Sequence, residues 1–167
     1  YVVLCDILAN CNQTSTRTIT LDTTNPNATL IFPPTGSSLL TNTNNFTANL
    51  SDNLGIKNST FYIRNSTNSI IVNQTTTFGA SITQTMIGTL QYLIDGVYSW
   101  WYDVFDWAGN TYSAINNTLN ITVDTIPPTI NFTNPTLSSG STTSTANIKV
   151  NVTSSDTSLA TTTIYLY

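Results

Sequence analysis

The sequence predicts an all-β protein made of β-sandwich domains, and three observations support this prediction. Good helix formers are scarce, because the chain contains no Glu, one Met and only four Lys and Arg residues together. Thr, Asn and Ser supply most of the polar surface, and they alternate with β-branched and aromatic residues in a way that favours strands and turns. The sequence also repeats itself with a period of about 100 residues, which is the size of one sandwich domain.

Charge is unusually low, since charged residues make up 7% of the chain against roughly 25% in typical soluble domains. The four basic residues form no patch, so we expect neither nucleic acid nor an anionic membrane as a partner. No apolar run approaches the roughly 18 residues that span a bilayer, so we expect no membrane insertion by this segment. The chain starts without a basic leader or a cleavage site, which indicates an interior piece of a longer secreted protein.

The internal repeat is clearest in two pairs of segments. Residues 18–26 match residues 120–128 at an offset of 102, and both segments carry Asp-Thr followed by Pro. Residues 45–51 match residues 147–153 at the same offset. Proline in a linker fixes φ and ends the preceding strand. The repeat therefore indicates tandem domains joined by linkers that contain proline.

These matches divide the chain into one complete domain between two partial ones. Residues 1–22 are expected to be the last two strands of a preceding repeat, because residues 1–8 align with residues 98–105 at an offset near 97. Residues 23–124 are expected to form the complete immunoglobulin-like domain, and residues 125–167 the first strands of a following repeat. Half-domains expose unpaired edges, so we favour excision from a longer array over strand complementation between copies.

Alternating apolar and polar residues, with turn residues between them, place the strands of the complete domain. The segment 33–44 is rich in turn residues and is expected to be irregular. The strands are expected near residues 28–32, 45–50, 59–64, 69–73, 80–87, 97–105 and 111–123.

The strongest local motif lies at the start of the penultimate strand. Asp95-Gly96-x-Tyr98 resembles the tyrosine corner of Greek-key sandwiches, in which the Tyr hydroxyl bonds back to nearby backbone. Two residues later, Trp100 stands at the inward position that a disulfide cysteine holds in antibody domains. We expect structural roles for these residues, with Trp100 filling core volume in place of a cross-link.

A turn and a linker complete this series of motifs. Asp106-Trp-Ala-Gly-Asn110 follows the penultimate strand, and Asp124-Thr-x-Pro-Pro128 follows the last one. In order and spacing, the series resembles the tandem immunoglobulin-like repeats of bacterial and archaeal cell-surface proteins of the adhesin, stalk or filament type. The resemblance covers essentially the whole chain and implies Greek-key sandwiches. The first partial repeat departs from it, because the turn that contains Ala9 has no glycine.

Eleven Asn residues stand in N-x-[ST] sequons, the acceptor pattern for N-linked glycans. The high content of Asn, Ser and Thr alone accounts for over half of them. A strand also favours the pattern, because Asn and Thr two residues apart both face solvent. We still expect several to be glycosylated, because a charge-poor extracellular surface gains solubility from glycans. Asn58, Asn65 and Asn73 lie near turns or strand ends and are better candidates than mid-strand Asn120. The others are Asn12, Asn27, Asn45, Asn49, Asn116, Asn131 and Asn151.

The two cysteines, Cys5 and Cys11, belong to the first partial repeat. The alignment places Cys5 inward on its strand and Cys11 in or just past the hairpin turn. A disulfide between them would close a short loop and replace the missing turn glycine. The alternative is two buried or free thiols, because a metal site with two Cys and no His is not expected.

No cofactor is expected, and calcium is the one alternative. Calcium clamps at the linkers of some surface repeats use Asp and carbonyl oxygens, and several Asp residues stand near the junctions of this chain. Asp is also the usual residue for hairpin turns and linkers, and no EF-hand motif is present. The candidate calcium ligands are Asp103, Asp106 and Asp124, with Asp6 and Asp22 in the preceding half-repeat.

A stripe of outward-facing apolar residues is a candidate interface. If Tyr98, Trp100 and Tyr102 face the core, the residues between them face out. An aligned aromatic stripe in two repeats indicates a buried contact, and we favour lateral packing on another chain or domain. A flat sugar-stacking platform and a misread register are the alternatives. The stripe comprises Trp101, Phe105, Tyr62, Leu4, Leu8 and Tyr165.

Catalysis is not expected. The chain has no His and no Glu, so general acid–base and triad chemistry lack their usual residues. The sequence favours a non-catalytic structural repeat of a glycosylated extracellular fibre, stalk or adhesin, with other copies or neighbouring repeats as partners. The alternative is a module that binds carbohydrate or another ligand, such as a host or environmental polysaccharide, through Trp101, Trp107 and Tyr62.

Overall fold

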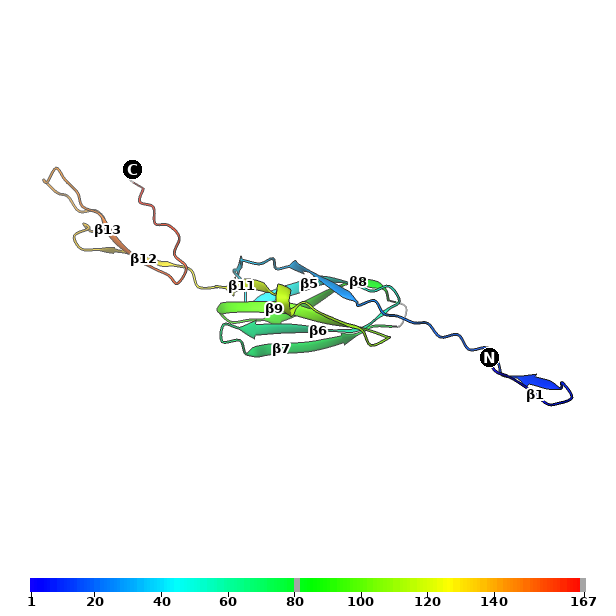
Figure 1. Ribbon diagram of the computed structural model, residues 1–167. Coiled ribbons are helices and arrows are strands. Elements are labelled where there is room, and N and C mark those ends of the chain that lie inside the picture. The colour runs from blue at the N-terminus through cyan, green and yellow to red at the C-terminus, as the bar shows by residue number, and fades with distance from the viewer. Residues whose placement is uncertain (80–81, 166–167) are drawn as a thin grey trace. The chain divides into compact units, whose positions relative to one another are not determined.

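The computed structural model describes residues 1–79 and 82–165. The chain is all-β and divides into two units, Tyr1–Val123 and Asp124–Tyr167, each of which is described by itself (Figure 1). The division falls beside the junction that the sequence places after residue 124. Among the described residues, no helix is long and apolar enough to cross a membrane.

A three-stranded antiparallel sheet forms one layer of the sandwich in the first unit. Its strand order is β3 (Asn27–Phe32), β5 (Thr43–Ser51) and β8 (Gln84–Tyr92). Burial alternates strictly along β5, because each second side chain points between the sheets. Strand β8 lies a few residues later than the strand expected at 80–87, of which residues 80–81 lie outside the described part.

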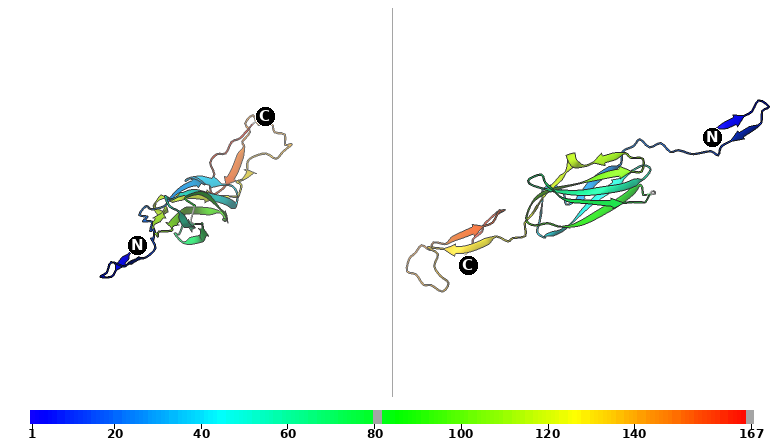
Figure 2. Two further views of the ribbon diagram at one scale, coloured as in Figure 1. Left: turned by 90° about the vertical axis from the view of Figure 1, so that its right-hand side faces the viewer. Right: turned by 90° about the horizontal axis from the view of Figure 1, so that it is seen from below.

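The second layer is a larger sheet centred on β9, the longest strand (Figure 1). Its pairing is antiparallel except between β4 and β11, which run parallel. The two sheets face each other across the core (Figure 2). In order, the larger sheet contains β4 (Ser37–Leu39), β11 (Leu119–Val123), β9 (Gly96–Asp106), β6 (Ile56–Asn65) and β7 (Ile70–Thr77), and β10 (Thr111–Ser113) also pairs with β9.

Aromatic side chains from both sheets fill the core. Phe46 of β5 lies 5.2 Å from Phe61 and 5.4 Å from Trp100, measured between ring centroids. Phe61 in turn lies 4.9 Å from Tyr102. These rings meet at tilted or edge-on angles, the arrangement that their charge distribution favours. Trp100 is fully buried and fills the core position predicted for it, although its indole N–H has no hydrogen-bond partner.

The last strand expected from the sequence, 111–123, is interrupted. Ser113 of β10 pairs with Asp103, and Leu119 of β11 pairs with Trp100. The chain between Ser113 and Leu119 is therefore longer than the stretch of β9 that it must pass, so the extra residues leave the ladder. They form a 3₁₀ turn, η1 (Ile115–Asn117). A similar correction applies to segment 33–44, because it contains strand β4 as well as turns.

The second unit contains a two-stranded antiparallel sheet of β12 (Thr129–Thr133) and β13 (Asn151–Ser155). Thr129 pairs with Ser155, whereas Asn27 of the first unit pairs with Ser51. With Thr129 equivalent to Asn27, at the offset of 102 found in the sequence, Ser155 becomes equivalent to Ser51. The second strand therefore has an offset of 104, where the sequence alignment has 102. Residues 161–165 form no strand.

Candidate functional site

The hairpin turn after β9 is organised by one carboxylate. Oδ1 of Asp106 accepts hydrogen bonds from the backbone N–H groups of Gly109, at 2.6 Å, and Asn110, at 2.7 Å. Its Oδ2 accepts a third from the Asn110 side-chain amide, at 2.7 Å. Gly109 has φ of 99°, a conformation that glycine adopts without steric cost. Asp106 therefore holds the turn through both oxygens.

The N-terminal hairpin contains the same device. Oδ1 of Asp6 accepts hydrogen bonds from the backbone N–H groups of Leu8 and Asn10, at 2.8 and 2.9 Å. The Asn10 amide donates to Oδ2 at 2.8 Å. Ala9 has φ of 65° and stands where the other turn has Gly109. The missing glycine is therefore replaced by an alanine in the same left-handed region, at the steric cost that such a residue carries.

Strand pairing in the two hairpins has the same register. Cys5 of β1 (Val3–Cys5) pairs with Cys11 of β2 (Cys11–Gln13), and Phe105 pairs with Thr111. The hairpins are thus equivalent at an offset of 100, and the offset near 97 is wrong. The alignment at 97 matches Asp6 with Asp103, whereas the hydrogen bonds of the turns match Asp6 with Asp106 and Asn10 with Asn110.

This register changes the equivalent positions of two residues, Leu4 and Cys5. Leu4 becomes the equivalent of Val104, which lies in the core, and does not belong to the outward stripe. Cys5 becomes the equivalent of Phe105 and faces outward, contrary to the inward position expected for it. Leu4 and Leu8 are both exposed in this chain. Cys5 and Cys11 are joined by a disulfide bond beside the turn.

The pKa values of the two turn aspartates are lowered. Burial raises the pKa of Asp106, but hydrogen bonds from the Asn110 side chain and from the backbone N–H groups of the turn outweigh it. The pKa of Asp6 is lowered chiefly by the Asn10 side-chain amide. Donors that point at a carboxylate stabilise its charged form. Both turns are therefore strongest when the aspartate is ionised.

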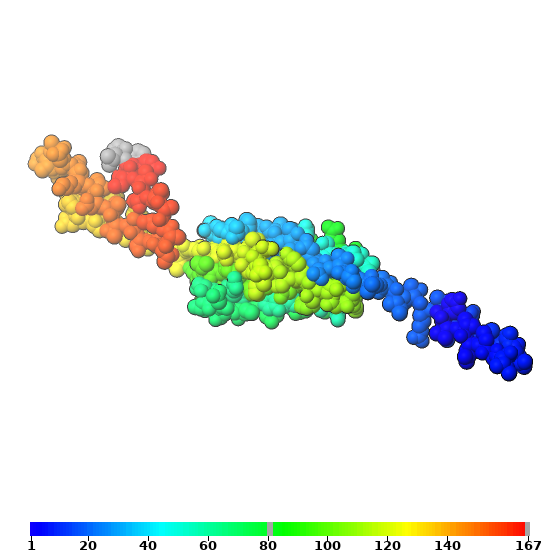
Figure 3. Space-filling view, in the orientation of Figure 1, coloured from blue at the N-terminus to red at the C-terminus, as the bar shows by residue number. Residues whose placement is uncertain are grey.

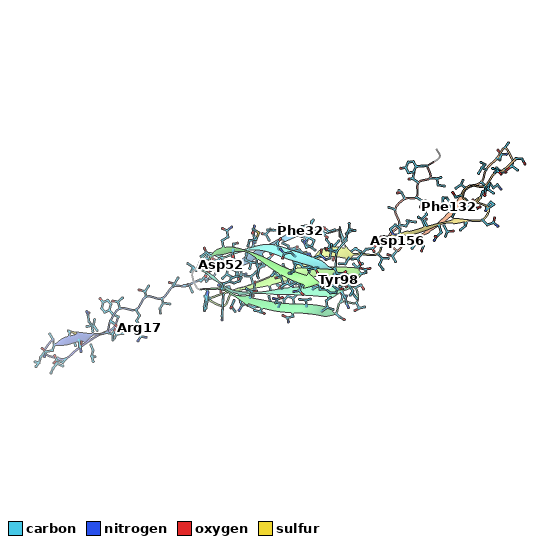
Figure 4. The ribbon with its side chains drawn as sticks, turned by 180° about the vertical axis from the view of Figure 1, so that it is seen from behind. Arg17, Phe32, Asp52, Tyr98, Phe132 and Asp156 are labelled. Atoms are coloured by element: carbon cyan, nitrogen blue, oxygen red, sulfur yellow. A yellow bond between two sulfur atoms is a disulfide. The ribbon has the colours of Figure 1, made fainter. Side chains whose placement is uncertain are left out.

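Three carboxylates meet beside the Asp106 turn. One oxygen from each of Asp22, Asp52 and Asp106 lies within 4.8 Å of the others. Figure 4 shows Asp52 at one end of the sandwich. Oδ2 of Asp52 accepts hydrogen bonds from the N–H groups of Leu54 and Gly55, while its buried Oδ1 has no partner. This oxygen set is of the kind that Ca²⁺ prefers, although Asp106 already uses both oxygens in its own turn.

The structure brings together only two of the five calcium ligands expected from the sequence, Asp22 and Asp106. Asp103 lies on the outer face of the larger sheet, where it accepts a short hydrogen bond from the Ser113 hydroxyl. Burial raises its pKa, and Ser113 and the nearby Trp101 indole partly offset that rise. The geometry of that indole N–H falls short of a hydrogen bond. Asp124 belongs to the second unit, so the acidic cluster contains two of the expected ligands, Asp22 and Asp106.

Asp124 takes part in a related arrangement within the second unit. The Ser158 hydroxyl donates to Asp124 at 2.5 Å and lies 3.0 Å from Asp156. Asp156 also accepts the backbone N–H of Ser158, as Asp52 accepts that of Leu54. A linker aspartate thus meets the aspartate of a loop in each unit. The two loops therefore share a hydrogen bond as well as a sequence pattern.

An exposed tryptophan stands beside the acidic cluster. Trp107 is 53% exposed, and its indole N–H donates to the carbonyl of Ile56 at 3.2 Å. The Lys57 ammonium lies 5.9 Å from its ring centroid. A pocket of about 330 Å³ is lined here by Thr20, Asp22, Leu54, Gly55, Trp107 and Ala108. This is the one place in the described residues where an exposed indole and a pocket coincide.

The expectation that Trp101 presents an exposed surface is wrong, because it is only 3% exposed. Its ring stacks on Tyr62 at 5.0 Å, and the Arg64 guanidinium lies 5.6 Å from it. The turn η1, yellow-green in Figure 3, lies against β9. Strand alternation predicts the face of Trp101 correctly, since the residue lies outside the core cluster. It cannot predict how deeply neighbouring side chains bury the ring.

The remaining stripe residues do not form one exposed surface. Tyr62 and Phe105 are half-buried on the larger sheet, and Tyr165 is an exposed residue of the second unit. A stacking platform made of Trp101 and Tyr62 is excluded by the burial of Trp101 in the described structure. The lateral contact expected at this stripe therefore has no continuous surface within the first unit.

The tyrosine-corner motif has the hydrogen bond that defines such corners. The Tyr98 hydroxyl donates to the backbone carbonyl of Ile94 at 2.9 Å, and Figure 4 shows Tyr98 on the sandwich. A Cβ at Gly96 would lie 3.2 Å from that hydroxyl oxygen, so glycine leaves room for the ring. Burial, and secondly the charge of Asp95, raise the pKa of Tyr98. The room left by Gly96, burial and the charge of Asp95 therefore all favour the neutral, hydrogen-bonded form of the Tyr98 side chain.

The sequon asparagines differ in accessibility. Asn58 and Asn65 are half-buried, and Asn65 accepts three hydrogen bonds from Thr67 and Ser69 through one oxygen, which shapes the β6–β7 turn. Asn120 is exposed but accepts the Ser99 hydroxyl at 2.6 Å. The other sequon asparagines are exposed: Asn12, Asn27, Asn45, Asn49, Asn73, Asn116, Asn131 and Asn151. Strand position is thus a poor guide to access, because mid-strand residues here face solvent.

No protein-family model matches the chain, and no curated protein matches it.

Proposed function

We propose that the chain is a non-catalytic structural repeat of a glycosylated extracellular fibre, stalk or adhesin-type surface protein. The observation that carries the proposal is the recurrence of the Asp-x-x-x-Asn hairpin 100 residues apart, with the same two hydrogen bonds from Asn to Asp and the same register. A turn repeated in such detail is the signature of tandem domains, each of which presents the same junction to its neighbour.

The strand order supports immunoglobulin-like Greek-key domains for these repeats. Sheet β3-β5-β8 faces sheet β4-β11-β9-β6-β7, and the corner tyrosine lies on β9. The same division of strands and the same corner occur in immunoglobulin-like sandwiches. The sequons and the scarcity of charge support an extracellular, glycosylated surface.

Two measurements test the structural proposal. Electron microscopy of native material, labelled with antibody against residues 23–124, is expected to show labelling at regular intervals along fibres or stalks. Intact-mass analysis is expected to reveal a longer chain that carries glycans. A native protein that is soluble, monomeric and unmodified would contradict the proposal.

Limited proteolysis of the 167-residue chain provides a simpler check. The sandwich is expected to resist cleavage, while residues 1–22 and 125–165 are cut, because their strands bury almost no side chains. A monodisperse monomer in which both ends resist protease would contradict the array.

Ligand binding is the second candidate, and the exposed Trp107 beside its pocket favours it. An indole face that borders polar groups suits the stacking of a sugar ring, with hydroxyls directed at Asp22. Polysaccharide pull-down or a glycan array should then show binding that Trp107→Ala removes. Tyr92→Ala is the matched control, since Tyr92 is an exposed aromatic residue that does not line this pocket; equal binding by both variants would reject this candidate.

A further inference from the structure

The outer face of the three-stranded sheet carries an exposed apolar row. Met86, Leu90 and Tyr92 of β8 are 69, 66 and 68% exposed, and strand alternation places them on the side away from the core. No charged residue occurs between Arg64 and Asp95. An edge strand that is both apolar and uncharged is usually protected in a native protein.

Two sequons stand directly opposite this row. Asn45 of β5 pairs with Leu90, and Asn49 pairs with Met86. Residues directly opposite in an antiparallel pair have Cβ atoms about 4.5–5.5 Å apart. Tyr92 is the diagonal neighbour of Asn45, at about 7–8 Å, within reach of a group attached to the asparagine.

The side chain of Asn45 is directed over β8. A Cβ at Gly88 would lie 3.0 Å from Asn45 Oδ1 and 3.1 Å from Nδ2, so the amide lies above a residue with no side chain. Gly88 stands between Met86 and Leu90 on the same face. Both Asn45 and Asn49 are exposed, and no side-chain hydrogen bond engages either amide in the described structure, unlike those of Asn65 and Asn120.

We propose that Asn45 and Asn49 carry N-linked glycans whose first sugars cover Met86, Leu90 and Tyr92. The inference rests on the glycosylated, extracellular part of the proposed function. A glycan on Asn45 Nδ2 begins above Gly88, in the middle of the row. Its C–H faces pack on aliphatic and aromatic side chains, while its hydroxyl groups remain in water.

A tethered glycan is a better occupant of this face than a second copy of the chain. Attachment makes contact with the row intramolecular, at an effective concentration of order mM or more. A second copy would have to seat against two acceptor asparagines in the centre of the sheet. The uncharged row, with neutral polar neighbours, also matches the neutral polar character of a sugar.

The test uses the 167-residue chain secreted from a host that glycosylates N-x-[ST] sequons. Peptide mapping by mass spectrometry measures occupancy at each sequon, and both Asn45 and Asn49 are expected to be modified. The variant Asn45→Gln/Asn49→Gln is expected to lower the Tm of the sandwich by about 4 °C. It should also bind an apolar dye several-fold more strongly than the parent. Asn27→Gln is the matched control, because Asn27 is an exposed sequon at the other edge of the same sheet.

Removal of the apolar row separates packing from the general effect of glycosylation. Met86→Thr/Leu90→Thr/Tyr92→Thr removes all three side chains of the row and keeps good strand-forming residues at exposed positions. In this background the loss of Tm caused by Asn45→Gln/Asn49→Gln is expected to disappear, whereas in the parent it remains. An equal loss in both backgrounds would overturn the packing.

The other outcomes separate this inference from the proposed function. Modification at other sequons, with Asn45 and Asn49 bare, overturns the inference and leaves the glycosylated array in place. No modification at any sequon overturns both. The parent chain could also be unmodified at these sites and form dimers that Met86→Thr/Leu90→Thr/Tyr92→Thr dissociates. That result would identify a second copy as the occupant and overturn the inference.

Discussion

Tyr102 shows how one hydroxyl ties the two sheets together. It is fully buried on β9, 2.7 Å from the Thr89 hydroxyl and 3.2 Å from the carbonyl of Phe46, both of which belong to the opposite sheet. Tyr102→Phe should lower the free energy of unfolding by about 1–3 kcal/mol, because both partners would be left unsatisfied in the core. Urea denaturation measures the change, and an unchanged midpoint would contradict this role.

The same residue predicts a loss of stability at high pH. Burial raises the pKa of Tyr102 to about 12, above its ordinary value of 10.0, although the Thr89 hydrogen bond lowers it somewhat. The unfolded chain loses the proton first, so stability is complete below pH 10.0 and falls as pH rises toward about 12. Denaturation at a series of pH values should show this fall, and Tyr102→Phe should reduce its slope.

Asp106 predicts the opposite dependence at low pH. Its pKa lies below the ordinary value of 3.8 because hydrogen bonds from Asn110 and Gly109 outweigh the effect of burial. The stabilisation is present above pH 3.8 and is lost as pH falls through the folded-state pKa. Asp106→Ala should cost about 3 kcal/mol at neutral pH and flatten the acid limb of the stability profile. Asp103→Ala is a control, since its carboxylate does not organise the turn.

At the scale of elements, the stacking of Trp101 of β9 on Tyr62 of β6 gives a prediction. Trp101→Ala removes a buried ring that stacks on Tyr62 and should cost about 3–5 kcal/mol. Because the ring is covered in the isolated domain, the substitution should not alter self-association at concentrations where the chain stays folded. Calorimetry measures the change in Tm, and sedimentation measures self-association. Loss of an oligomer without a change in Tm would instead support a lateral interface at Trp101.

The disulfide of the N-terminal hairpin gives a second prediction at this scale. All residues of β1 and β2 are exposed, so the hairpin adds no side chain to the core of the sandwich. Cys5→Ser/Cys11→Ser should therefore leave the Tm of the sandwich unchanged, while amide exchange within residues 1–14 becomes faster. Hydrogen exchange resolved by peptide measures this, and a lower Tm would show that the hairpin stabilises the domain.

For the whole molecule, the offsets of 100, 102 and 104 show how the repeat accommodates differences. Equivalent residues of the two hairpin turns lie 100 residues apart, and those of the two linkers lie 102 residues apart. The pairing of Thr129 with Ser155 requires 104. Loops absorb the differences because an added surface residue costs little. The two linker segments thus keep the same aspartate, Asp22 and Asp124, while the loop lengths around them differ.

Sequence alone was sufficient for the all-β class, most of the strands, Trp100 in the core and the tyrosine corner, because alternation and turn residues act over a few neighbours. Three features depended on tertiary structure. Burial of Trp101 involves side chains of the neighbouring strand, Tyr62 among them, and the meeting of Asp22 with Asp52 and Asp106 requires distant loops to converge. The apolar row opposite Asn45 and Asn49 depends on which strands pair and in what register. Local patterns specify the face that a side chain occupies, and only the folded chain decides what lies over that face.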